Sequence, residues 1–219
     1  MQVAAADALL HEEPLGTRRL FQDVDPTAAA VAAAHWLQAA ANVAAEVSGG
    51  DPTEVVMEAD DIEALPVETP TLVLERLNAG ESPREVVLDL IDEAMAVAEG
   101  RLPDPSALLE RIEEADDLAE RYGADQELRE QLMPIRITAL DPRRPAHDLL
   151  EDLLSGIHGC QLVHSSYADL DEDDDFDEDD DLDQDDDTDE AVDRRSEALH
   201  EMFTAAVRAK AAGAKDRLL

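Results

Sequence analysis

The chain has 219 residues, with 55 acidic residues against 17 basic ones, so its formal net charge is -38 at pH 7. A charge of this size and sign repels nucleic-acid and membrane phosphates and attracts basic proteins, which argues against direct nucleic-acid binding. Aromatic residues make up only 3% of the chain, so the core must be aliphatic and rich in small side chains, with Trp36 as its one large anchor.

A capping residue followed by proline marks five expected helix starts. The side-chain oxygen accepts a backbone N–H, and proline supplies a helical φ where its missing N–H costs nothing. Glu54 and Glu85 complete two capping boxes, and glycines follow as expected helix ends. These signals predict helices over 26–47, 52–64, 70–78, 83–99 and 105–122, preceded by Asp25, Asp51, Thr69, Ser82 and Asp104 and closed by Gly49, Gly80, Gly100 and Gly123.

The first of these helices contains the longest uncharged stretch, Pro26 to Ala45, which is mostly alanine. His35, Gln38 and Asn42 share one helical face with Glu46, and apolar residues lie opposite. A membrane-spanning helix would need a more uniformly hydrophobic surface, so the pattern predicts an amphipathic helix of a soluble protein. The N-terminus also lacks a basic segment followed by an apolar run, which argues against a signal peptide.

The periodicity weakens after residue 123. We expect a helix over 126–133, a short strand over 135–140, a helix over 147–154, and a second strand over 161–164 that could pair with the first. A final amphipathic helix is predicted over about 190–212, with one apolar face formed by Leu199, Met202, Phe203, Ala206 and Val207. The fold class is therefore mostly α, a small helical bundle with at most a minor two-stranded β element.

Acidic residues fill the segment from Asp169 to Asp193, where eighteen of twenty-five positions are Asp or Glu and none is basic. Like charges at this density repel one another, and few apolar side chains are present to form a core, so we expect a disordered tract. The chain then divides into an N-terminal segment (1–24), a helical domain (25–155), a connecting segment (156–168), the Asp-rich tract (169–193) and a C-terminal helix (194–219).

Three side chains that could bind a soft metal lie close together in sequence: His158, Cys160 and His164. On an extended strand they would span roughly 20 Å at about 3.3 Å per residue, too far for one ion, and no fourth ligand is evident. A buried free cysteine between incidental histidines is the better interpretation. A Cys nucleophile with a His base would need an orienting group and an oxyanion site, and neither can be identified. We therefore expect no catalytic residues, no bound cofactor and no association with a membrane.

The sequence favours a non-enzymatic, acidic interaction or regulatory protein of the cytoplasm, the compartment suggested by its single cysteine. Its Asp-rich arm would bind a basic partner, such as a nucleic-acid-binding protein, in competition with nucleic acid. Two alternatives remain: a helical scaffold or homodimer whose acidity only serves solubility or salt adaptation, and an enzyme or metal site around Cys160. The residues expected to contact the partner are Asp173, Asp174, Asp175, Asp179, Asp180, Asp181, Asp185, Asp186 and Asp187.

Overall fold

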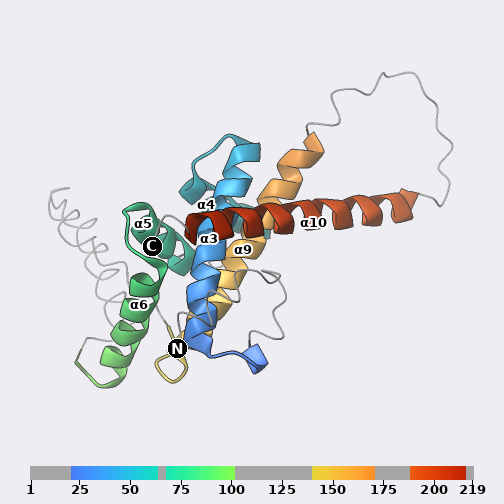
Figure 1. Ribbon diagram of the computed structural model, residues 1–219. Coiled ribbons are helices and arrows are strands. Elements are labelled where there is room, and N and C mark those ends of the chain that lie inside the picture. The colour runs from blue at the N-terminus through green and yellow to red at the C-terminus, as the bar shows by residue number, and fades with distance from the viewer. Residues whose placement is uncertain (1–20, 64–67, 102–139, 171–187, 216–219) are drawn as a thin grey trace, which may run out of the picture.

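A computed structural model describes residues 21–63, 68–101, 140–170 and 188–215. Helices dominate this part of the chain, and it contains no strand (Figure 1). The prediction of a mostly α protein is confirmed. In chain order the helices are α3 (Pro26–Ser48), α4 (Pro52–Glu63), α5 (Glu68–Asn78), α6 (Pro83–Ala98), α9 (Pro145–Leu170) and α10 (Thr188–Lys215).

The alanine-rich helix α3 lies at the centre and packs against each of the other five helices. Alanine side chains are short, so neighbouring backbones can approach α3 closely on several sides. Trp36 and Leu37 are fully buried among them. Trp36 is thus the large anchor that the composition predicts. The alanines buried with it include Ala29, Ala30, Ala32, Ala33, Ala34, Ala40, Ala41 and Ala44.

Side-chain caps begin the helices where the sequence predicts them. Asp25 accepts a hydrogen bond from the backbone N–H of Ala28 at 3.0 Å, and α3 starts at the following proline. Ser82 and Glu85 form a reciprocal capping box at the start of α6, in which each side chain accepts from the other's backbone N–H at 3.2 Å. Gly49, Gly80 and Gly100 follow three of the helices with positive φ, as expected for glycine ends.

Helix α5 begins at Glu68, two residues before the predicted start, so Thr69 is not its cap. Proline is tolerated within the first helical turn because its missing N–H would have no helical partner there. Pro70 is buried and faces Gly156 of α9. Tertiary packing therefore decides where this helix begins.

Helix α9 corrects two predictions at once. It runs without a break through the predicted connecting segment 156–168 and through the predicted strand 161–164. Buried residues continue at helical spacing along it, at Leu153, Ile157, Cys160 and Val163. Gly156 follows the predicted helix over 147–154, but it lies inside α9. The helix comes so close to α3 and α5 at this glycine that no larger side chain is accommodated without movement.

Helix α10 lies across α3 and α9, and its N-terminal half extends beyond the bundle (Figure 1). Phe203, Val207 and Ala211 belong to the same buried cluster as Trp36. The core is therefore not confined to residues 25–155, and the C-terminal helix supplies part of it. Two residues of the predicted apolar face of α10 are exposed instead: Met202, which is 65% exposed, and Ala206.

Several predicted elements lie outside the described residues: the helices over 105–122 and 126–133, almost all of the strand over 135–140, and residues 171–187 of the Asp-rich tract. The prediction of disorder is wrong at the two ends of this tract, because residues 169–170 belong to α9 and residues 188–193 to α10. Within the ranges that are described, no helix is both long and apolar enough to cross a membrane.

Candidate functional site

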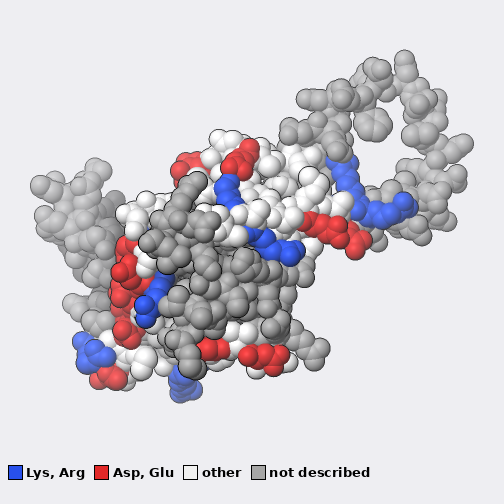
Figure 2. Space-filling model, in the orientation of Figure 1, with Lys and Arg blue, Asp and Glu red and all other residues white. Residues whose placement is uncertain are grey.

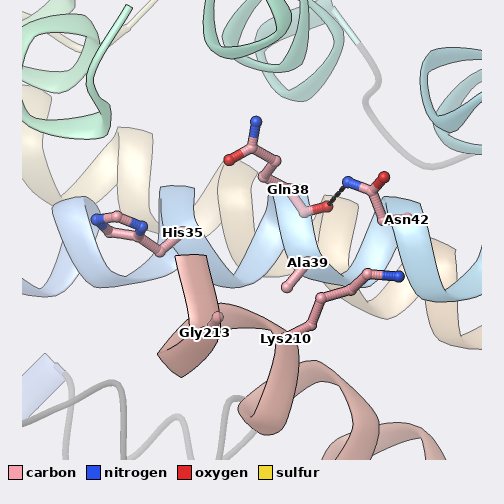
Figure 3. A pocket seen from close by; sticks show the side chains of 7 residues that line it. His35, Gln38, Ala39, Asn42, Lys210 and Gly213 are labelled. Carbon is pink, nitrogen blue, oxygen red and sulfur yellow. Dashed lines mark hydrogen bonds between the residues drawn. The ribbon is translucent and has the colours of Figure 1, made fainter. Parts of the chain in front are cut away.

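A polar stripe on α3 faces the C-terminal part of α10. His35, Gln38 and Asn42 are half-buried along this stripe, and Glu46 continues it at the surface. The sequence predicts this face, but it does not predict that α10 covers it. Figure 3 shows His35, Gln38 and Asn42 following one another along α3, with Lys210 and Gly213 on the adjacent turns of α10.

Between the two helices lies a groove of about 400 Å³, which we call the α3–α10 groove. The groove exists because small residues line it: Ala39 of α3 and Ala211 and Gly213 of α10 leave space that larger side chains would fill. Polar groups line the rest. The lining residues are His35, Gln38, Ala39, Asn42, Lys210, Ala211 and Gly213.

Hydrogen bonds within the groove are partly satisfied by the protein itself. The Asn42 side-chain amide donates to the main-chain carbonyl of Gln38 at 2.6 Å. The Lys210 ammonium pairs with the Glu46 carboxylate, and these side chains are 35% and 71% exposed. A pair so exposed is screened by water and adds little stability. The groove thus offers amide, imidazole and ammonium groups for binding a small polar molecule, and none of the described residues that line it carries a hydroxyl or a thiol.

The sequence alone indicated the three side chains on α3 but not the groove. Lys210 carries no local signal of its own. The useful clue is a pairing: a polar stripe on an otherwise alanine-rich helix, together with a C-terminal helix that is basic where the body is acidic.

The three residues of the weak metal candidate are separated by the geometry of α9. Cys160 and His164 are one turn apart and both face the core, while His158 is exposed. At 3.6 residues per turn, His158 lies on a different side of the helix from Cys160. The described residues contain no group of three His, Cys, Asp or Glu side chains that could hold a metal ion.

Burial also changes the chemistry of these side chains. It raises the pKa of the Cys160 thiol to about 12, which keeps the thiol protonated and poorly nucleophilic at neutral pH. Burial likewise lowers the pKa of His164, favouring its neutral form. The His164 ring packs against Phe203 of α10, with ring centroids 5.3 Å apart. Both residues therefore contribute to the contact among the helices.

The partner-binding Asp residues predicted between 173 and 187 lie outside the described residues. Their chain neighbours are placed, however, since α9 ends at Leu170 and α10 begins at Thr188. Both helices pack against α3, so the acidic segment is joined at each end to a helix of the core.

The body carries acidic side chains of its own, gathered over α5 and α6 in Figure 2. Exposed acids on α6 include Glu85, Asp89, Asp92 and Glu93. One cation is paired among them: Arg76 donates to Glu81 at 3.0 Å and to Asp89 at 2.7 Å, and these bonds raise the pKa of Arg76.

Comparison of the chain with known protein families, curated proteins and solved structures finds no match.

Proposed function

We propose that this protein is a non-enzymatic, acidic interaction protein, and that its Asp-rich segment binds a basic partner in competition with nucleic acid. The observation that carries the proposal is the charge of the segment, with eighteen acids among the twenty-five residues from 169 to 193. A dense line of hydrated negative charge resembles a nucleic-acid backbone to a cationic protein surface.

The attachment of the segment supports this function. Both flanking helices, α9 and α10, are packed into the core. A chain segment attached to the core at both ends has fewer conformations than a free tail of equal length, so it loses less entropy when a partner orders it. The acidic side chains exposed on α6 add to the negative electrostatic potential around the helical bundle.

The experiment is a comparison of three full-length proteins: the natural chain, a variant with the nine Asp residues between 173 and 187 named above changed to Asn, and a variant with the same nine changed to Glu. Each is used to co-purify proteins from the source cells, and each is then added to a labelled DNA duplex bound by the basic proteins recovered. We expect the natural chain and the Glu variant to recover those proteins and to release the duplex, and the Asn variant to do neither.

The Glu variant separates the effect of charge from that of side-chain identity, because it keeps the negative charge at all nine positions and changes the side chain at each of them. Equal recovery by all three proteins would refute the proposal and favour the alternative in which acidity serves only solubility. Recovery that depends on charge but leaves the duplex bound would refute the competition with nucleic acid alone.

A further inference from the structure

Helix α10 has a second apolar face, opposite the one that packs into the core. The core face contains Phe203, Val207 and Ala211. At 3.6 residues per turn, a row of small residues and one methionine lies on the other side of the helix. All of them are exposed in the structure: Ala198, Met202, Ala205 and Ala209.

The spacing along this outer face is that of a helix-pairing seam. Ala198, Met202, Ala205 and Ala209 are separated by four, three and four residues, which is the a/d pattern of a coiled coil. In Figure 1, α10 crosses α3 and α9, and at 3.6 residues per turn this outer face lies opposite the buried Phe203, Val207 and Ala211. A second helix could pack there without disturbing the bundle.

We propose that the outer face of α10 pairs with the same face of a second copy of this chain, with the two helices antiparallel. In the register that places Met202 opposite Ala205 of the other copy, Ala198 lies opposite Ala209. The small side chains allow the two helices to approach closely, and each bundle remains on the far side of its own α10. The contact is short, so it belongs to the weak class of interfaces.

Charge complementarity identifies the second copy as the occupant. Glu201 and Arg208 border the seam on the same side, and in this register Glu201 of each copy faces Arg208 of the other. A two-fold axis repeats the pair, so the surface is complementary to itself. In each chain Glu201 is exposed and Arg208 is partly exposed, so both side chains are accessible to a second copy.

The acidic tract decides between the two orientations. It joins α10 at Thr188, the N-terminal end of the helix. Parallel helices would bring the tracts of both copies to the same end, where their like charges repel. Antiparallel helices place the two tracts at opposite ends. This arrangement also leaves both tracts accessible to other molecules.

The test is sedimentation velocity of the full chain over a range of concentrations at an ionic strength of about 0.15 M, where the Debye length is about 8 Å. The average mass should rise from 23.8 kDa toward twice that value as concentration increases. Glu201→Arg should weaken self-association by about tenfold or more, since it turns two attractive pairs into repulsive ones. Glu93→Arg, the same charge change at an exposed position of α6, should leave association unchanged.

A mixture of two proteins with opposite charge changes tests the pairing more directly. Arg208→Glu should also weaken self-association, but an equal mixture of the Glu201→Arg and Arg208→Glu proteins should form a mixed dimer, because both of its pairs are again attractive. A natural chain that stays monomeric at every concentration would overturn the proposal, as would a Glu201→Arg protein that associates like the natural chain.

A covalent test uses only exposed positions, and it decides the matter even if Arg208→Glu fails to fold. Oxidation of an equal mixture of Met202→Cys and Ala205→Cys proteins should give the mixed disulfide dimer faster than either protein alone gives its own dimer. The natural Cys160 does not interfere, because it is fully buried. Faster linkage of the Ala205→Cys protein with itself would contradict the antiparallel register.

Discussion

Replacing Gly156 by alanine tests whether α9 packs against α3 and α5 as closely as the structure shows. A Cβ atom at residue 156 would lie 2.8 Å from the Cβ of Pro70 and 3.0 Å from the Cδ1 of Leu37. Neither neighbour moves easily, because Pro70 is a rigid ring in the first turn of α5 and Leu37 is fully buried. The added methyl group must therefore push the helices apart.

Two opposing effects determine the size of the change. Overpacking of a core costs about 1–3 kcal/mol, while alanine in place of glycine inside a helix returns about 1 kcal/mol. Because the 2.8 Å contact is with a ring held by the backbone, we expect the upper part of the overpacking range and a net loss of about 1–2 kcal/mol. For a chain of this size that lowers Tm by about 2–4 °C per kcal/mol.

The assay is urea unfolding followed by far-ultraviolet circular dichroism, with thermal unfolding as a second measurement. Gly213→Ala is the matched control, because Gly213 lies in α10 and a Cβ there meets nothing within 4 Å. That substitution should be neutral or slightly stabilising. If Gly156→Ala were as stable as the natural chain, or more stable, α9 would not lie against Pro70 and Leu37 as described.

Three further outcomes are expected. Phe203→Ala should lose about 3–5 kcal/mol of unfolding free energy, measured by urea unfolding, whereas Met202→Ala in dilute solution should change it little; equal effects would contradict the burial of α10. Because burial lowers the pKa of His164 in the folded state, the unfolded state takes up a proton at a higher pH than the folded state does, and the free energy of unfolding should fall as the pH drops through about 6.5, the ordinary histidine value. His164→Leu should remove this part of the pH dependence. The same pH dependence of stability in both proteins would refute the reasoning. Cys160 should react with a thiol reagent at neutral pH only at the rate of unfolding, and rapid labelling of the native protein would exclude a fully buried thiol.

Local signals in the sequence determine most of the helix boundaries. Asp25 and Ser82 bond backbone N–H groups within three residues of themselves, and the glycines at 49, 80 and 100 end their helices through their own φ. These interactions involve only a few neighbouring residues, so a short stretch of sequence contains everything that they need.

Predictions from the sequence are wrong where a distant segment decides the outcome. The predicted helix over 147–154 stops too early and residues 161–164 are not a strand, because α9 continues from Pro145 to Leu170 along α3 and α5. A short apolar run fits either conformation, and the partner that it packs against makes the choice.

The charge, the acidic tract and the polar stripe on α3 are properties of the sequence alone, and the proposed binding of a basic partner rests on the first two. Only the tertiary structure reveals that α10 covers that stripe, that Phe203 shares a core with Trp36, and that Met202 and its neighbouring alanines are left on an exposed face. An amphipathic pattern tells which residues can be buried together. Because α10 is apolar on two opposite faces, its sequence allows either face to be the buried one, and the larger buried surface of Phe203 and Val207 selects the face that packs against the bundle.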